Sequence, residues 1–540
     1  MTDYFYVSLQ YSAIQKTVLR HDRLWSMAGV SQMLSQINEI DLPFVVDELG
    51  GETLVAGGGK FTARFADPAS AAQARQEMIK IVSTRLPMLE FQISDTVVAG
   101  DLKQAKEKNL IVQLSNDKKR FRGYGITYNP MFQTCEECGE YPGTAARYFG
   151  DNKKTLCRIC DMSVAQRLNP NKIRQESLAN LTSIEKIYRQ YLETVDPDQS
   201  IASVEIATDF KNLFPEPPEP PDPPDNSMRQ RMAVWFSDAN NMNVKVRIWL
   251  SQPDQEIPGI FHMLTAAYID ITAKTLSQIF TIDTWNRWES EKTHYLPFRL
   301  IIAGGDDLCI VMPEQYVLKF AKQLSRSFHE QVTSFEQGGW FSTRWLKDHA
   351  SPEKNRPARD PGSFSFGGAF LITSLHTPFR SIHEQGEHLM GQAKKGTERL
   401  ANSINWQLLN AGPETGTDSL LTYEKPIYID DLPETGIPEK MKDRLTFDAY
   451  LKLKDRYSTG KSSLSNSQIK TIADILQQGG TPEDVEDRLL LAASAGLEKG
   501  LKYVLGDLSF RTGAEKNGQL IPARIATMLE ILTIDERREK

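Results

Sequence analysis

Two adjacent aspartates lie between two apolar runs in the segment LIIAGGDDLCIVMP, residues 300–313. The pattern predicts a β-hairpin whose turn is Gly304-Gly305-Asp306-Asp307. Glycine permits positive φ and leaves the backbone open to a bound triphosphate. The two carboxylates would repel each other, and Mg²⁺ would remove that repulsion because it takes one or two carboxylates together with substrate phosphates. An acidic surface turn is the alternative explanation.

A third acid, Asp238, follows the apolar run RMAVWF at residues 231–236. Two-metal nucleotidyl transfer uses acids that clamp both metal ions from neighbouring strands. We therefore predict that Asp238, Asp306 and Asp307 are catalytic and bind Mg²⁺ or Mn²⁺. Lys394 ends a helix that begins near Pro378, and it could bind a triphosphate as a compact cation. Complementing the helix C-terminus would explain this lysine equally well.

Four of the five cysteines form two CxxC pairs, Cys135-Cys138 and Cys157-Cys160, separated by 18 residues. Two such knuckles can bring four thiolates to one tetrahedral Zn²⁺. A site with four cysteine ligands has no open position for water, so we predict a structural zinc element. Cys309 lies in the predicted hairpin and is expected to be a buried apolar residue.

The order of the predicted elements is the same in both halves of the chain. Each half reads β-α-β-β-α-β, the ferredoxin-like arrangement of polymerase and cyclase palms. The hairpin VAGGGKFTARF at residues 55–65 aligns with IAGGDDLCIVM at residues 302–312. Gly57, Gly58 and Gly59 then correspond to the turn of the second copy, without its acids. We interpret the chain as an internal duplication with one acid-free palm.

The fold class predicted for the 540 residues is α+β, with two ferredoxin-like palms, a zinc element between them and a helical C-terminal domain. Seven prolines in FPEPPEPPDPPDNS predict an extended linker. The predicted units are residues 1–130 (first palm), 131–213 (zinc element and helical segment), 214–227 (linker), 228–398 (catalytic palm) and 399–540 (mainly helical).

The composition is that of an ordinary soluble globular protein. Hydrophobic residues make up 40% and charged residues 25%, and the net charge is −7, so the chain carries no overall basic signal for nucleic acid. The N-terminus lacks a secretory signal, and no apolar run approaches the ~20 residues that a membrane span requires. We expect a cytoplasmic protein without a membrane partner.

Several motifs together resemble a known family. The segment at residues 8–35 is similar to the family's Q-x-x-I…R-x-x-D-L-W…S pattern, SDANNMN at residues 237–243 is similar to its D-G-D-N-M-G turn, and the GGDD turn and the Ala393-Lys394 pair also match. The chain resembles the large subunit of type III CRISPR effector complexes, a cyclic-oligoadenylate synthetase with two palms. The likeness spans residues 8 to about 395.

This resemblance implies a nucleotidyltransferase that joins ATP into cyclic oligoadenylate when target RNA binds a guide-RNA complex. It implies partner subunits, guide RNA and target RNA, with Gly304, Gly305, Lys394 and Gly57 to Gly59 around the nucleotides. Two departures are Asn240 and Asn243, which replace the family's second acid and closing glycine. The chain begins at the first palm, and His21-Asp22 has no further ligands nearby, so we expect no HD nuclease activity.

Two alternatives remain open. The chain could be a scaffold subunit with a weak or inactive palm, as the two asparagines would favour. It could also be a stand-alone diguanylate-cyclase-like enzyme, although those enzymes use one palm as a homodimer. A scaffold would form no oligoadenylate from ATP, Mg²⁺ and target RNA. A diguanylate-cyclase-like enzyme would prefer GTP to ATP.

Overall fold

The computed structural model describes the two predicted palms and the zinc element. The described residues are 3–12, 14–18, 23–86, 89–106, 133–139, 141–149, 152–201, 203–216, 230–337, 339–350, 360–399, 401–409 and 427–429. Most of the predicted linker and nearly all of the predicted C-terminal domain lie outside them. No helix in these ranges is both long enough and apolar enough to cross a lipid bilayer.

The first palm is an antiparallel sheet with the strand order β2-β3-β1-β4, and β5 also pairs with β1. This is the predicted ferredoxin-like order. Its elements are β1 (Tyr4–Ser12), α1 (Ile14–Val18), α2 (Leu24–Gln36), a π-helical turn (Ile37–Asp41), α3 (Leu42–Glu48), β2 (Glu52–Gly57), β3 (Lys60–Phe65), α4 (Pro68–Arg85), β4 (Glu90–Ile93), β5 (Val97–Ala99) and α5 (Leu102–Ala105).

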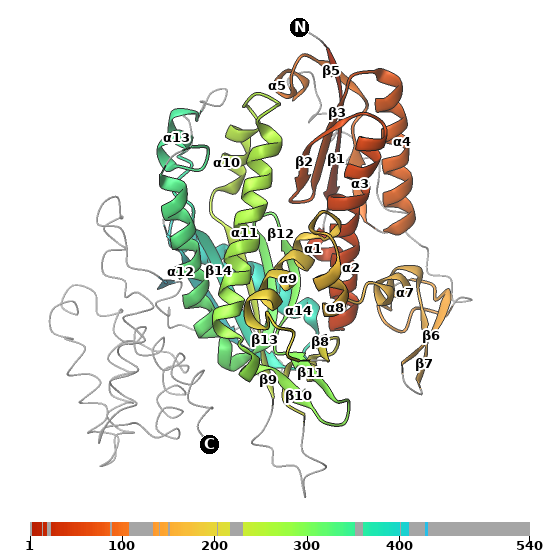
Figure 1. Ribbon diagram of the computed structural model, residues 1–540, viewed down its shortest axis with the longest axis vertical. Coiled ribbons are helices and arrows are strands. Elements are labelled where there is room, and N and C mark those ends of the chain that lie inside the picture. Colours follow the sequence, from red (N-terminus) through yellow and green to blue (C-terminus); the bar gives the residue numbers. More distant parts are fainter. Residues whose placement is uncertain are drawn as a thin grey trace, which may run out of the picture.

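The second palm repeats this order as β12-β13-β9-β14 and adds β15, parallel to β14, and β16. Figure 1 shows the two sheets with their helices. The elements are β9 (Arg231–Ala239), α10 (Met242–Trp249), α11 (Ile257–Ile279), β12 (Arg299–Gly304), β13 (Asp307–Pro313), α12 (Val317–Glu336), α13 (Thr343–Asp348), β14 (Phe366–Ser374), α14 (Phe379–Gly396), β15 (Ser403–Leu408) and β16 (Ile427–Tyr428).

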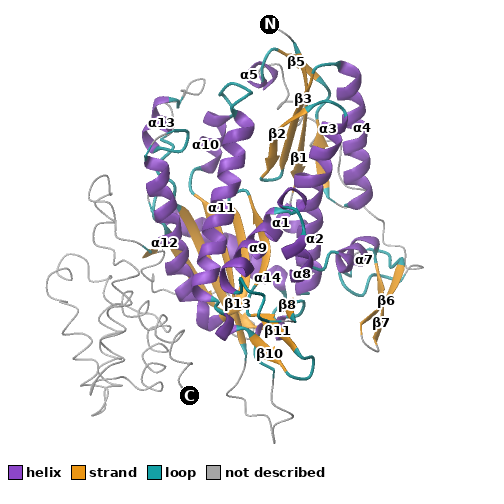
Figure 2. Ribbon diagram, in the orientation of Figure 1, coloured by secondary structure: helices purple, strands orange, loops and turns teal. Residues whose placement is uncertain are grey.

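Smaller elements connect the palms. The two-stranded hairpin β6–β7 lies between the two cysteine pairs and projects from the side of the molecule (Figure 2). A three-stranded sheet has the order β10-β11-β8. The bounds are β6 (Ala145–Phe149), β7 (Asn152–Leu156), α7 (Arg158–Ala165), α8 (Pro170–Gln175), α9 (Ser183–Val195), β8 (Val204–Ile206), β10 (Asn286–Trp288) and β11 (Thr293–Leu296). Short 3₁₀ turns span Leu178–Asn180, Phe210–Leu213, Ile282–Thr284 and Glu314–Tyr316.

Both faces of the second sheet are buried, which explains the continuous apolar run of β9. Trp235 points to one face and contacts Phe320 of α12, with ring centroids 5.4 Å apart. Phe236 points to the other face, where α14 approaches so closely that a Cβ at Gly386 would lie 2.4 Å from its ring. Alternating residues of β9 therefore anchor helices on both sides and hold its C-terminal end rigidly in place.

The two hairpins share an irregularity as well as a sequence pattern. The register of β2–β3 shifts between Thr53 and Val55, and that of β12–β13 shifts between Leu300 and Ile302. These positions correspond when the two Gly-Gly turns are aligned. A bulge is an extra residue with a specific local geometry, so a shared bulge supports the interpretation of an internal duplication.

Candidate functional site

The three predicted acids meet at one edge of the second sheet. Asp307, the first residue of β13, lies directly opposite Asp238 in the antiparallel ladder, and Asp306 precedes it in the turn. One carboxylate oxygen of each residue lies within 4.8 Å of the others. The turn that presents them requires Gly305, whose φ of 65° is unfavourable for residues with a Cβ.

Lys394 of α14 lies against this cluster. Its Nζ donates to Oδ2 of Asp238 and, at 3.4 Å, to the carbonyl of Ala239. The side chain is almost fully buried, and its stem passes over Gly367, where a Cβ would lie 2.4 Å from its Cγ. Lys394 thus reaches the acids because β14 has glycine at that point.

The acid cluster carries more negative charge than the fold itself neutralises. Burial, a hydrogen bond with Asp238 and repulsion from the other acids raise the pKa of Asp306 well above its ordinary value. Burial and repulsion from Asp238 raise the pKa of Asp307 to about 7, although Lys394 opposes the shift. Two strongly raised carboxyl pKa values next to one cation favour a site that binds further positive charge.

A cleft of about 670 Å³ opens beside Asp238 and Asp306. Lys394 and Arg399 contribute positive charge to its wall, and Asn241 lies at the turn where β9 enters α10. The cleft is large enough for a nucleotide triphosphate, and the cationic side chains of Lys394 and Arg399 are suited to bind its phosphates. Sequence reasoning missed Arg399, although it follows directly after the lysine-rich end of α14.

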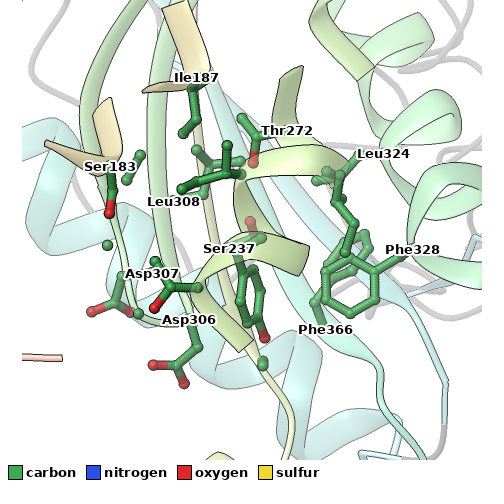
Figure 3. Close-up of a pocket in the computed structure, with 18 residues that line it drawn as sticks. Ser183, Ile187, Ser237, Thr272, Asp306, Asp307, Leu308, Leu324, Phe328 and Phe366 are labelled. Atoms are coloured by element: carbon green, nitrogen blue, oxygen red, sulfur yellow. The ribbon is translucent and has the colours of Figure 1, made fainter. Parts of the chain in front are cut away.

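A second, much smaller cavity of about 30 Å³ lies under the hairpin. Figure 3 shows Asp306 and Asp307 at one end of this region and the apolar side chains of Leu324, Phe328 and Phe366 along another side. Tyr268 of α11 also lines it, and among the described residues its buried hydroxyl has no hydrogen-bond partner. Burial and the charges of the three acids raise the pKa of Tyr268. No sequence pattern indicated this tyrosine.

The two asparagines that depart from the family pattern, Asn240 and Asn243, lie in different surroundings. Asn240 is fully buried, and its Nδ2 donates to Ser365 Oγ at 2.8 Å and to the carbonyl of Ala401 at 3.4 Å. Asn243 is exposed at the cleft. Lys245 stabilises the same turn, because its buried Nζ donates to the carbonyls of Asn240, Pro361 and Ser363 at 2.9, 2.7 and 3.3 Å. Asn240 therefore serves the turn and offers the cluster no carboxylate.

The four cysteines of the two knuckles also come together. Their sulfurs all lie within 4.8 Å of one another, and Cys138 Sγ is 3.9 Å from Cys157 Sγ. That separation far exceeds the ~2.05 Å of a disulfide bond. The hairpin β6–β7 brings the knuckles together, and Cys157 is the N-cap of α7. Four thiols converging on one point fit a tetrahedral Zn²⁺.

The acid-free turn of the first palm meets the acidic turn of the second. A Cβ on Gly305 would lie 3.2 Å from Gly58 Cα and 3.3 Å from its nitrogen, so the two backbones touch. Gly57, Gly58 and Gly59 form this facing turn, and Gly58 and Gly59 have φ values of 55° and 73°. Lys60 occupies the position that corresponds to Asp307 and is exposed.

Comparisons with known proteins address the fold. No protein-family model matches the sequence, and no curated protein matches it. The crystal structure of Csm1 from T. onnurineus aligns with a TM-score of 0.51 at 13% identity, covering 100% of this chain and 70% of that chain. The apo Csm1–Csm4 cassette aligns with a TM-score of 0.50 at 14% identity, covering 99% of this chain and 70% of that chain. The chain has the fold of Csm1.

A further match is the Csm1–Csm4 subcomplex in the type III-A CRISPR-Csm interference complex, with a TM-score of 0.49 and 14% identity, covering 99% of this chain and 70% of that chain. The predicted α+β class and the predicted resemblance to the type III large subunit are confirmed at the level of the fold. At this identity the Csm1 fold leaves the chemistry to be argued from the residues of this chain.

Proposed function

We propose that this chain is the nucleotidyltransferase subunit of a guide-RNA-directed type III CRISPR complex and makes cyclic oligoadenylate from ATP. The observation that carries the proposal is the convergence of Asp238, Asp306 and Asp307 within 4.8 Å beside a cleft large enough for a nucleotide triphosphate. The Csm1 fold supports the assignment to a type III complex, and the four cysteines support a structural zinc element between residues 131 and 213.

The donor set fits Mg²⁺ or Mn²⁺, because three carboxylates with hard oxygen atoms face one point. Asp238, Asp306 and Asp307 would hold the ions. When bound, two such ions lower the pKa of an attacking 3′-hydroxyl and neutralise charge on the α-phosphate and the departing pyrophosphate.

The remaining residues of the cleft bind and orient the nucleotide. Lys394 neutralises Asp238 in the absence of metal, and it is free to turn to a triphosphate once the acids have other counter-charges. Arg399 offers a second cation at the same wall. A Cβ at Gly304, Gly57 or Gly58 would meet nothing within 4 Å, so the backbone of the two facing turns is open to a nucleotide at these glycines.

Csm1 in the cassette structure is bound to Csm4. By analogy, we infer that this chain associates with other type III subunits, guide RNA and target RNA, and that it works in the cytoplasm, where RNA and ATP are available. The domain division at residues 130, 213, 227 and 398 belongs to the same proposal, with β15 and β16 of the last unit pairing onto the sheet of the second palm.

The test is product formation by the assembled complex with ATP, Mg²⁺ and target RNA, read by mass spectrometry. We expect 3′–5′ linked cyclic oligoadenylate. The variants Asp306→Asn and Asp307→Asn should lower the rate by roughly a hundredfold or more, because metal-ion charge stabilisation is worth several kcal/mol. Asp283→Asn, which removes an exposed carboxylate of the same palm, is the matched control.

The scaffold role is the second candidate, and a specific observation favours it. Asn240 supplies no acid, and Lys394 already neutralises Asp238 without a metal. A scaffold would give no oligoadenylate with any nucleotide while still supporting assembly with RNA. A product formed from GTP and not from ATP would instead favour the diguanylate-cyclase-like alternative.

A further inference from the structure

The loop between α10 and α11 of the second palm is inserted against the first palm. Its buried residue Asp254 accepts three hydrogen bonds. Oδ2 accepts from the Tyr6 hydroxyl at 2.5 Å and from Arg64 Nη1 at 3.2 Å, and Oδ1 accepts from the Leu102 N–H at 2.9 Å. The three donors all belong to the first 106 residues, whereas the acceptor belongs to the second palm.

An apolar shell encloses this carboxylate. Ile257, at the start of α11, packs with Tyr6, Val97 and Leu102 in a small buried cluster. Burial and the Asp254 hydrogen bond raise the pKa of Tyr6, which therefore stays protonated and remains a donor. Asp254 is only 6% exposed, so the first palm supplies the donors that a solvated aspartate would take from water.

Two further contacts close the junction. Arg64 is held from its other side by Glu52, with Nη2 to Oε2 at 2.6 Å. Lys106 donates from Nζ to the carbonyl of Leu250 at 3.1 Å, where α10 ends. The contact with Glu52 thus holds the Arg64 guanidinium in the position from which it donates to Asp254. Pre-organised donors lower the entropy lost in forming the contact.

The position of Asp254 links this junction to the site. α11 begins three residues later at Ile257 and packs on β2 of the first palm, while α2 packs on β12 of the second. The same packing brings Gly58 against Gly305. Fixing the start of α11 on the first sheet therefore fixes how the acid-free turn faces the acidic turn.

We infer that Asp254 is a positioning residue that locks the catalytic palm onto the acid-free palm and so sets the geometry in which two nucleotides are joined. The link to nucleotide joining rests on the proposed function. The lock itself is a statement about the fold and can be measured separately.

The test compares Asp254→Asn and Tyr6→Phe with Asp196→Asn in the full chain. Asp196 forms a more deeply buried ion pair with Arg174, 2.9 Å long, within the segment of α8 and α9, so its loss controls for general destabilisation. Breaking a buried pair is strongly destabilising. Tyr6→Phe keeps the ring and removes one donor, which provides a milder variant if Asp254→Asn folds poorly.

Hydrogen exchange and calorimetry report on the lock. For Asp254→Asn we expect faster exchange at Leu102 and in residues 250–257, with unchanged protection in β9 and α14, and unfolding that splits into two steps. Mn²⁺ affinity of the acid cluster should stay unchanged. The rate of joining two ATP molecules should fall about tenfold, which corresponds to about 1.4 kcal/mol. Tyr6→Phe should shift each readout in the same direction.

Three results would overturn the inference. These are unchanged exchange at the junction, one-step unfolding like that of Asp196→Asn, or wild-type joining in a variant whose junction has opened. If the wild-type complex makes no oligoadenylate, the proposed function fails, and exchange and calorimetry still decide whether Asp254 couples the palms.

Discussion

Asp238 and Asp307 face each other on paired strands, a place where like charges normally destabilise a sheet. Lys394 offsets one of these charges. The remaining negative charge is reduced because Asp306 and Asp307 bind protons more tightly than usual, as their raised pKa values indicate. A fold that accepts this cost at one point of a well-packed sheet is best explained by a ligand that carries positive charge.

The raised pKa of Asp307 predicts how stability depends on pH. Its folded value of about 7 lies above the ordinary value of 3.8, so the folded state binds more protons between these limits. This contribution to stability is largest below about pH 4 and is lost as the pH rises through 7. The melting temperature of the metal-free protein should fall between about pH 5 and about pH 8. Added Mn²⁺ should restore the melting temperature at about pH 8.

The matched variant for this pH prediction is Asp307→Asn. It cannot titrate, so its melting temperature should fall less over the same pH range and respond less to Mn²⁺. One pKa unit corresponds to about 1.4 kcal/mol, which makes the difference measurable. Equal pH profiles for the two proteins would show that Asp307 does not titrate as the structure implies.

Short motifs allowed the acids, the cysteines and Lys394 to be identified from the sequence. Tyr268 and Lys245 could not be found this way. Tyr268 lies on a helix whose spacing indicates only a packed face. Lys245 would be expected at the surface, and it is buried only because distant backbone carbonyls at Pro361 and Ser363 surround its ammonium. Such partners come from the tertiary fold.

At the scale of elements, the β-α-β-β-α-β core of each palm was predicted in the correct order, because apolar periodicity over long segments is a strong signal. The strands β15 and β16, which extend the second sheet, lie in the range predicted to be mainly helical. The sequence did not indicate α10 or the sheet β10-β11-β8. α10 has eight residues, and its N-cap Asn241 has a positive φ and makes no side-chain cap. β8 has three residues and pairs with β11 some ninety residues later. Such short strands form only through pairing with a neighbouring strand, which the sequence pattern does not show.

The cluster of four cysteines yields a prediction about stability. We expect the purified protein to contain stoichiometric zinc and to lose it in Cys135→Ser, with local unfolding of β6, β7 and α7. Structural zinc supplies folding free energy directly. Elemental analysis and hydrogen exchange measure the two effects.

Cys309→Ser is the matched control for the zinc prediction, because Cys309 is buried in β13 away from the cluster. It should retain its zinc. In Cys135→Ser, the local unfolding should extend from α7 to α2. The two helices are in close contact, since a Cβ at Gly29 would lie 2.3 Å from the Ser163 carbonyl. Full zinc content in Cys135→Ser would contradict a four-cysteine site.

At the scale of the whole molecule, the two palms are related as pseudo-symmetric halves. In each palm, one helix between the first strand and the hairpin packs on the hairpin of the other palm, α11 on β2 and α2 on β12. The duplication was visible in the sequence as two aligned glycine-rich hairpins. Their contact was not, because a repeat shows that two units are similar and does not show how they face each other. The packing of α11 and α2 brings the two turns together.

Alanine at the two facing glycines would measure this contact. Gly58 and Gly305 both have positive φ, so Gly58→Ala and Gly305→Ala share a backbone cost of about 1 kcal/mol. A Cβ at Gly58 meets nothing within 4 Å, whereas one at Gly305 would press on the backbone of Gly58 at 3.2 Å. In denaturant unfolding, Gly305→Ala should therefore lose more stability than Gly58→Ala. The excess should disappear in Asp254→Asn, where the palms are no longer locked together. Equal losses in the wild-type background would mean that the two turns are not in contact in solution.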